Sequence, residues 1–475
     1  MLASVSASKE PCAHIAPAAT TTLEPHLTRL LSLNTFDLPQ QQAEDLAHSA
    51  SAVLPTPTSD ILGGHPLRIL VAPSGFKESL GPEHVADAIE AGIRKVLDRS
   101  SVILRKIPLH DGGEGFARAL VAAHGGSIVD VPVTGPTGSA VESHLGFIGK
   151  DKKTAVLDMA AAAGLRLVPK DERDPTITTT YGVGQLIKRA LDAGSTKIII
   201  GCGDSGTSDG GAGMLQALGV RLLDEDGEEL PKAGGGRSLA RLASICWADV
   251  HPRLQKNAGK PPASHLHTSS NVNPAEKVQI EAVCNIKNVL CGSKGVARVY
   301  GPQKGATPAQ VDMLASSLER LAQVAHSTLG EDISQTPGSG ASGGLGAGLM
   351  LLGATLRARA EAINEYFEFD RVFENQWDFV ITAEGALDFQ SPNGKMTTEI
   401  ARRARRNGAQ VVALAGTIGE GADGCYGAGI KAFTSILRGP VTLEQAIVQT
   451  EVLVKDGAEK VMRMIMVGLA LGRHR

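Results

Sequence analysis

The sequence predicts an α/β protein with two domains, one of which is inserted into the other. Apolar runs of strand length alternate with amphipathic helical patterns at residues 67–96, and the same alternation returns at residues 378–471. Between them, from residue 127 to about residue 158, short strands separated by turns are typical of a more antiparallel sheet. The 55 glycines fit a fold with many tight turns between strands and helices.

Because the two ends of the chain share this alternation, we expect them to form one Rossmann- or flavodoxin-like three-layer domain. A second, mixed α/β domain is expected as the insertion. The expected boundaries are residues 66–125 together with 345–475 for the discontinuous domain, and residues 126–344 for the inserted one. Residues 1–65 are rich in Ala, Ser, Thr and Pro, and we expect them to be an extension that is partly disordered.

The elements can be justified in chain order from their apolar patterns. The buried-strand run 67–72 is followed by a helical stripe that consists of Val85, Ile89, Ile93 and Val96. The same reasoning predicts, in order, a strand at 101–107, helices at 116–123 and 178–191, a strand at 197–200, a helix at 213–218, a hairpin at 220–231, a strand at 280–284, a helix at 308–325, strands at 378–382 and 410–415, and a final helix at 443–471.

The composition excludes several classes of partner. With 20% charged residues and a formal net charge of -3, the chain has no basic surplus for binding nucleic acid or an anionic membrane. No apolar run reaches the ~18 residues that span a bilayer. The six cysteines form no C-x-x-C pair, which argues against a zinc site. We therefore expect a cytoplasmic enzyme, monomeric or homodimeric, that acts on a small molecule.

The stretch GCGDSGTSDGGAGM, at residues 201–214, directly follows the strand 197–200. Its glycines at positions 201, 203 and 206 satisfy G-x-G-x-x-G, and Asp224 lies at roughly the distance expected of a ribose-binding acid. These residues alone would indicate an NAD-dependent oxidoreductase. The same glycine turn also suits a phosphoryl-transfer site, in which backbone amides approach phosphate oxygens.

Carboxylates and lysines recur in turns at or near the ends of predicted strands. The carboxylates are Asp111, Asp204, Asp209, Glu384 and Asp388, and the lysines are Lys77, Lys304 and Lys395. Phosphoryl transfer needs cations for the phosphate charge, carboxylates for magnesium, and a carboxylate that accepts the hydroxyl proton. No P-loop or protein-kinase motif is present. The repeated acid and lysine turns favour phosphoryl transfer over hydride transfer.

Ten motifs, in order, closely resemble the type 1 glycerate kinase family. They are SGFKESL, DGGEG, VTGPTG, LDMAAAAGLRLVP, TTTYGVGQLI, DSGTSDGGAGMLQALG, YGPQKGAT, GASGGLGAGL, ITAEGALDFQSPNGK and LAGTIG. The resemblance covers the chain from about Leu67 to the C-terminus. It implies a two-domain α/β enzyme that uses ATP and Mg²⁺ to phosphorylate D-glycerate, and we expect 2-phosphoglycerate rather than 3-phosphoglycerate as the product.

The resemblance also implies the site residues, whose individual roles are hypotheses. Expected catalytic residues are Asp111, Asp209 and Lys77. Expected substrate- and phosphate-binding residues are Gly112, Gly113, Glu114, Ser205, Lys304, Gly343, Gly344 and Lys395. Expected magnesium ligands are Glu384, Asp388 and Asp204.

The chain departs from the family pattern at two informative positions. Asp204 stands where the family usually has glycine, and Asn285 stands where it usually has aspartate. If that aspartate contacts magnesium or substrate, Asp204 could supply the missing charge. An alternative is that the chain is a catalytically inactive, kinase-like binding protein.

Overall fold

The computed structural model describes residues 62, 64–76, 79–255, 278–330, 332–393 and 395–473. Most of the predicted extension, as well as the candidate residue Lys77, lies outside the described residues.

The N- and C-terminal parts of the chain form one parallel five-stranded sheet. Its strand order is β13-β12-β11-β1-β2, which in chain order within this sheet is the flavodoxin-like order 2-1-3-4-5. The sequence-based fold class is therefore confirmed. The strands are β1 (Leu67–Val71), β2 (Val102–Lys106), β11 (Phe379–Leu387), β12 (Gln410–Ile418) and β13 (Ile430–Ser435).

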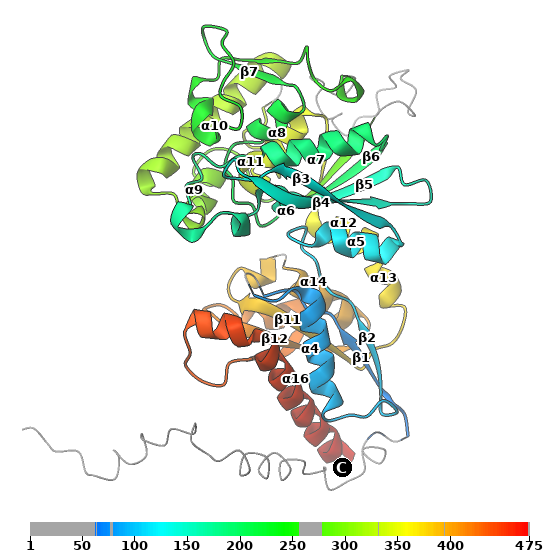
Figure 1. Cartoon of the computed structure of the whole chain (residues 1–475). Helices are drawn as coiled ribbons and strands as arrows, with labels where there is room; N and C mark the ends of the chain where they lie inside the picture. Colours follow the sequence, from blue (N-terminus) through cyan, green and yellow to red (C-terminus); the bar gives the residue numbers. More distant parts are fainter. Residues whose placement is uncertain are drawn as a thin grey trace, which may run out of the picture. The chain divides into compact units, whose positions relative to one another are not determined.

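Helices cover both faces of this sheet because successive strand residues point to opposite sides. Leu70 packs in the same hydrophobic cluster as Ile400 of α14 (Met396–Arg406). On the other face α4 (Pro82–Arg94) and α16 (Leu443–Arg473) lie side by side (Figure 1).

The helical stripe predicted for α4 is correct for three of its four positions. Val85, Ile89 and Ile93 are buried in α4, but the helix ends at Arg94, and Leu97 rather than Val96 is the next buried side chain. The backbone leaves the helix after Arg94, which breaks the 3.6-residue period on which the fourth position depended.

A second, six-stranded sheet has the order β10-β9-β6-β5-β4-β3. Its first four strands in that order are parallel, while β4 is antiparallel to both β5 and β3, as the turn-rich sequence predicts. The strands are β3 (Ser127–Thr134), β4 (Ala140–Ile148), β5 (Thr154–Asp158), β6 (Lys197–Gly201), β9 (Gln279–Cys284) and β10 (Thr355–Ala358). Asp158 pairs with Gly201, which pairs with Val283, so the carboxyl ends of β5, β6 and β9 lie together.

Further elements complete this part of the chain. They are α5 (Phe116–His124), α6 (Ala160–Ala163), α7 (Tyr181–Asp192), α8 (Ala212–Ala217), the strand pair β7 (Arg221–Leu223) and β8 (Ser244–Cys246), α9 (Val296–Tyr300), α10 (Pro308–Leu329), α11 (Ala341–Leu351), α12 (Arg359–Tyr366) and α13 (Phe369–Val372). Helix α5 packs against β3, β4 and β5, and β10 pairs with β9. The expected domain boundaries stay a prediction.

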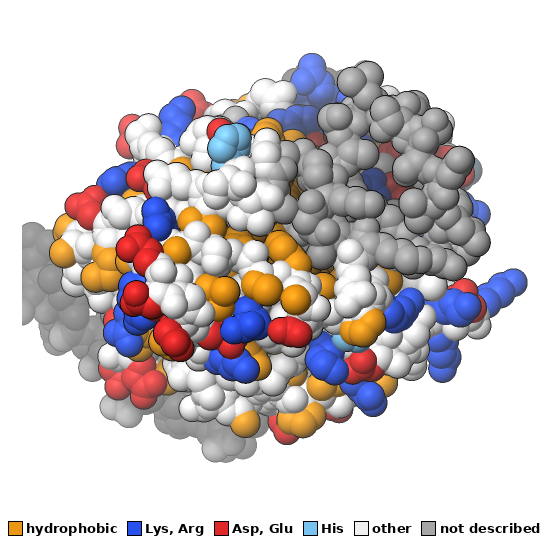
Figure 2. Space-filling model, turned by 90° about the horizontal axis from the view of Figure 1, so that it is seen from above, with side chains coloured by type: hydrophobic (Ala, Val, Ile, Leu, Met, Phe, Trp, Pro, Cys, Tyr) orange, Lys and Arg blue, Asp and Glu red, His pale blue; other side chains and the backbone are white. Residues whose placement is uncertain are grey.

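The surface agrees with the near-neutral composition. On the face drawn in Figure 2, acidic and basic side chains of the described residues are interspersed and do not gather into a basic patch. Among the described residues, no helix is both long and apolar enough to cross a membrane.

Candidate active site

The segment 109–115, which ends in the DGGEG turn at residues 111–115, contacts the carboxyl ends of strands in both sheets. It follows β2 and passes the end of β1, where the Leu109 N–H donates a hydrogen bond to the Pro73 carbonyl (2.8 Å). It then reaches the six-stranded sheet, where the Gly115 N–H donates to Asp158 Oδ2 (2.7 Å). Ligands of open α/β sheets bind outside the carboxyl ends of the strands. The turn that the sequence singled out therefore lies where a ligand of either sheet would be expected.

The carboxylate of Asp111 is held by a residue that the sequence reasoning did not single out. Arg359, the first residue of α12, places Nη1 3.2 Å from Asp111 Oδ2. The Gly113 N–H donates to the other oxygen, Oδ1 (3.1 Å). Both charged side chains remain partly accessible, at 30% for Asp111 and 22% for Arg359. Asp111 is thus oriented by its partners and can still be reached by a small ligand.

Asp204 packs directly on the same turn. Its Oδ2 accepts a hydrogen bond from the Glu114 N–H (3.3 Å), and a Cβ atom at Gly113 would lie 2.1 Å from that oxygen. Position 113 must therefore be glycine if Asp204 is to keep this place. Asp204 itself has a φ of 50°, in the left-handed region that is unfavourable for residues other than glycine.

Glu114 lies among charges of both signs. Arg166 Nη2 is 2.6 Å from Glu114 Oε1. Burial raises the pKa of the Glu114 carboxyl, Arg166 opposes that rise, and the negative charges of Asp158 and Asp204 add to it. A carboxyl group with a raised pKa is better suited to exchanging a proton near neutral pH.

Asp209 follows Asp204 by five residues in the chain, but its side chain is fully buried. Its Oδ2 accepts from the Thr180 N–H (2.8 Å), the Thr180 hydroxyl (2.9 Å) and the Gly213 N–H (3.2 Å), and its Oδ1 accepts from the Gly211 N–H (3.2 Å). Burial raises the pKa of this carboxyl, and the hydrogen bonds oppose the rise. These contacts fix the start of α8 and leave no exposed surface on the side chain. This geometry favours a structural role over the catalytic one predicted from the sequence.

We predict that Asp209→Asn lowers the free energy of unfolding by about 3 kcal/mol, because the amide NH₂ would face backbone N–H donors inside the fold. Urea denaturation would measure the change. Asp151→Asn is the matched control, since Asp151 is exposed and accepts a single hydrogen bond from the Lys153 N–H. A stable Asp209→Asn protein that has lost turnover would instead support the catalytic role.

Lys304 and Ser205 meet beneath the 201–211 loop. Lys304 Nζ donates to Ser205 Oγ (2.9 Å) and to the Thr207 carbonyl (2.6 Å), and the lysine is buried. Burial lowers the pKa of Lys304 to about 7, and the nearby Asp209 charge opposes this change. A neutral amine can still donate both hydrogen bonds. Lys304 therefore binds the loop from the protein interior, and its partner Ser205 is only partly buried.

The pKa of Lys304 predicts a pH dependence of stability. Between pH 7 and its ordinary pKa of 10.5, the unfolded chain binds more protons than the folded one. The free energy of unfolding should therefore rise with pH across this window. Lys304→Met removes the titrating group, so its unfolding free energy should rise less than that of the wild type between pH 7 and pH 10. Parallel slopes in denaturation series at several pH values would contradict this prediction.

Gly343 and Gly344 pack against the same loop. Ser342, Gly343 and Gly344 interrupt α11 with three successive positive φ angles, and the Gly343 carbonyl accepts from the Gly210 N–H (3.0 Å). A Cβ atom at Gly343 would lie 1.9 Å from the Thr207 carbonyl oxygen. Both glycines are buried, so their evident function is close backbone packing. Their predicted contact with phosphate remains a prediction.

The remaining candidates lie at the end of β11. Lys395 Nζ is 3.9 Å from Asp388 Oδ1 and donates to the Ala386 carbonyl (2.6 Å). The Thr397 hydroxyl approaches Glu384 Oε2 at 3.5 Å. Among the described residues, no group of three or more His, Cys, Asp or Glu side chains is placed to hold a metal ion. Glu384, Asp388 and Asp204 are thus not assembled into a three-carboxylate site.

Asp158 is a further residue that the sequence reasoning missed. It is fully buried at the end of β5, and His144 Nε2 lies 3.2 Å from its Oδ1. Its position within LDMAAAAG, at the end of an apolar strand, was the available signal, since that is where the other carboxylates were found. Arg359 had no comparable signal, because the short strand before it was not predicted.

The dinucleotide alternative finds no support in the geometry. Asp224 is paired with Arg241, and its Oδ1 also accepts from the Asp226 and Glu228 N–H groups. Its carboxylate therefore closes the tip of the predicted hairpin and is not directed toward a ribose. The glycines at 201 and 203 pack against the 111–115 turn, as a Cβ at Gly203 would lie 2.7 Å from the Gly113 Cα.

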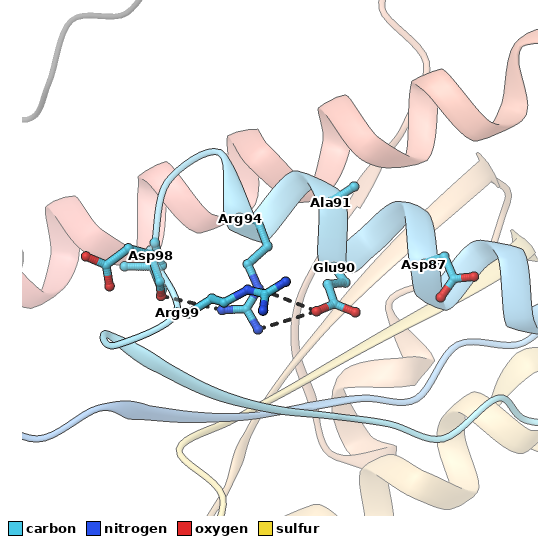
Figure 3. A pocket seen from close by; sticks show the side chains of 7 residues that line it. Asp87, Glu90, Ala91, Arg94, Asp98 and Arg99 are labelled. Atoms are coloured by element: carbon cyan, nitrogen blue, oxygen red, sulfur yellow. Dashed lines mark hydrogen bonds and ion pairs between the residues drawn. The ribbon is translucent and has the colours of Figure 1, made fainter.

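A surface hollow beside α4 also lies away from the site (Figure 3). Its side chains pair with one another: Arg94 contacts Glu90 Oε1 (3.3 Å) and the Asp98 carbonyl (3.4 Å). The hollow is next to the loop that enters β2 and so belongs to the amino ends of the strands, opposite the edge that binds ligands.

Comparison with known proteins decides the family. The model of the glycerate kinase family matches residues 69–260 and 262–466. The chain belongs to the glycerate kinase family. Its similarity to this family therefore extends through both sheets and nearly to the end of α16.

Members of this family align with this chain over almost their full length. A glycerate kinase from Halalkalibacterium halodurans is 41% identical over 83% of this chain and 97% of its own length. A glycerate 2-kinase from Escherichia coli is 38% identical over 80% and 93%. A crystal structure from Salmonella typhimurium LT2, provisionally named glycerate kinase 2, is 38% identical, covers 85% of this chain and 99% of its own, and has a TM-score of 0.64.

Proposed function

We propose that this chain transfers the γ-phosphate of ATP to a hydroxyl group of D-glycerate and that the product is 2-phosphoglycerate. The observation that carries the proposal is the segment 109–115: the Leu109 N–H donates to the Pro73 carbonyl just beyond β1, and the Gly115 N–H donates to the Asp158 carboxylate at the end of β5. Family membership supports the choice of substrate and of ATP as donor. The name of the Escherichia coli relative, a glycerate 2-kinase, supports the position of transfer.

Asp111 is the proposed base for the substrate hydroxyl. Its carboxylate is partly accessible and accepts the Gly113 N–H, whereas Asp209 is fully buried. Phosphoryl transfer depends mainly on such positioning and on cations that stabilise phosphate charge. The proposed cations are Lys395, which follows β11, and Lys77, which lies outside the described residues.

The donor set at the end of β11 is compatible with Mg²⁺. This ion prefers carboxylate oxygens and usually binds through one or two carboxylates together with substrate phosphates, so it needs no three-carboxylate cage. Glu384 and Asp388 would hold it. When bound, Mg²⁺ would offset the negative charge of the transferring phosphate. Asp204 is better placed to act on the 111–115 turn, where it accepts the Glu114 N–H.

Phosphorus NMR of the purified chain incubated with D-glycerate, ATP and Mg²⁺ tests this function. We expect a new phosphomonoester resonance at the position of 2-phosphoglycerate, and none when D-glycerate is omitted. A resonance of 3-phosphoglycerate would contradict the position of transfer only. Binding of D-glycerate and ATP without any product would instead favour the catalytically inactive alternative.

A further inference from the structure

Arg359 is a cation at the substrate edge of the six-stranded sheet. It directly follows β10, whose carboxyl end lies beside that of β9. Burial raises the pKa of the Cys284 thiol at the end of β9 to about 12, and the positive charge of Arg359 opposes that rise. The same guanidinium lies 3.2 Å from Asp111 Oδ2, and its Nη1 also donates to the Asp111 carbonyl (3.4 Å). Arg359 therefore bridges the sheet edge and the 111–115 turn.

Two other arginines near this edge have different surroundings. Arg357 belongs to a structural network: it pairs with Glu365 (2.6 Å) and with the buried Glu281 (3.5 Å), and its guanidinium lies 5.6 Å from the centre of the Tyr366 ring. Arg166 pairs with Glu114, but its side chain is 71% exposed. The side chain of Arg359 is 22% exposed, so solvent screens its charge less than that of Arg166.

We propose that Arg359 binds the carboxylate of the substrate and thereby selects small hydroxy acids over neutral polyols. This inference rests on the proposed function. A planar guanidinium can donate two parallel hydrogen bonds to a carboxylate, and it cannot be deprotonated in a protein. In this arrangement the Asp111 carboxylate occupies the place of the substrate carboxylate until substrate enters.

Replacement of Asp111 by the substrate carboxylate at Arg359 would couple substrate binding to proton transfer. When the substrate carboxylate takes the guanidinium, Asp111 loses that ion pair and can accept the proton of the substrate hydroxyl. The hydroxyl oxygen then forms its bond to the γ-phosphorus, the bond to the leaving ADP oxygen breaks, and the proton remains on Asp111. A neutral polyol cannot displace Asp111 from Arg359, so it would leave the base engaged.

Steady-state kinetics of Arg359→Gln test this role. Loss of a charge-assisted contact should raise KM for D-glycerate by about tenfold to a hundredfold, with a smaller change in KM for ATP. Arg359→Lys keeps the charge but loses the planar pair of donors, so its KM should lie between those of the wild type and Arg359→Gln. The preference for D-glycerate over glycerol, measured as a ratio of kcat/KM values, should fall in both variants.

Arg118→Gln is the matched control, because Arg118 is an exposed arginine that forms an ion pair with Asp130 of β3 (3.6 Å). Calorimetric titration of D-glycerate without ATP gives a second readout that does not depend on turnover, and thermal denaturation checks folding. An unchanged KM and unchanged binding in a folded Arg359→Gln protein would overturn the inference. A rise in KM for Arg166→Gln instead would also overturn it. Absence of phosphoryl transfer by the wild type would reject the proposed function. The calorimetric comparison of D-glycerate binding by the wild type and Arg359→Gln would still test whether Arg359 binds the carboxylate.

Discussion

Gly343→Ala is expected to lower the free energy of unfolding by about 3 kcal/mol or more, which is a large part of the stability of an ordinary domain. Two costs add at this position. Its φ of 71° costs about 1–2 kcal/mol for an L-residue with a Cβ. The new Cβ would also lie 1.9 Å from the Thr207 carbonyl oxygen, so the loop carrying Thr207 or the turn in α11 must move.

Gly138→Ala separates these two costs. Gly138 has a φ of 89°, but a Cβ atom there meets nothing within 4 Å. Its substitution should cost only the backbone strain, about 1–2 kcal/mol. Guanidinium denaturation of both variants would measure the difference. Equal losses of stability would mean that Gly343 is not packed against the 201–211 loop, and would restore the hypothesis of an open phosphate-binding turn.

The glycine motifs illustrate what sequence reasoning can and cannot reach. The sequence indicated that 201–214 and the GASGGLGAGL motif, at residues 340–349, are glycine-dependent segments. It could not distinguish backbone that approaches a ligand from backbone that approaches other backbone, because both require the absence of a Cβ. Gly343 and Gly344 are buried against the 207–211 loop, so here the glycines are explained by packing within the protein.

Differences in burial also explain why the sequence could not separate catalytic from structural residues among the charged candidates. Asp209 and Asp111 look alike in sequence, since both are aspartates in glycine turns, yet one is fully buried and the other partly accessible. The difference arises because Thr180, far away in sequence, closes over Asp209 at the start of α7. Contacts between residues so far apart in the chain produce no local sequence pattern from which burial could be predicted.

The architecture was easier to predict than the site. Long apolar runs such as β1 and β12 fixed the alternation of strands and helices, from which the flavodoxin-like sheet follows. Among the missed strands, β10 and β13 are short or carry charged residues on half-exposed edges, with the sequences TLRA and IKAFTS. Missing β10 also concealed Arg359, because its place at the sheet edge depends on the strand before it.

Asp204→Gly is expected to lower kcat/KM by about a hundredfold or more, while the protein remains at least as stable. The substitution removes a negative charge beside the 111–115 turn, where the Asp204 carboxylate accepts the Glu114 N–H. It also replaces an aspartate with a φ of 50° by a residue that adopts this conformation readily. Loss of activity without loss of stability would therefore report on the carboxylate itself, and a melting curve alongside the assay would show it.

The double variant Asp204→Gly with Asn285→Asp is expected to recover activity to within about tenfold of the wild type, since one carboxylate would replace the other. The geometry supports this exchange: Gly201 of β6 and Val283 of β9 are register partners, and the Cys202 N–H donates to the Val283 carbonyl (2.9 Å). Positions 204 and 285 thus follow adjacent strands at the same edge. Asn285→Asp alone is the control and should give no gain, because a second carboxylate would repel Asp204. A double variant as inactive as Asp204→Gly would show that Asp204 acts by orienting the 111–115 turn, a task that a carboxylate at position 285 cannot take over.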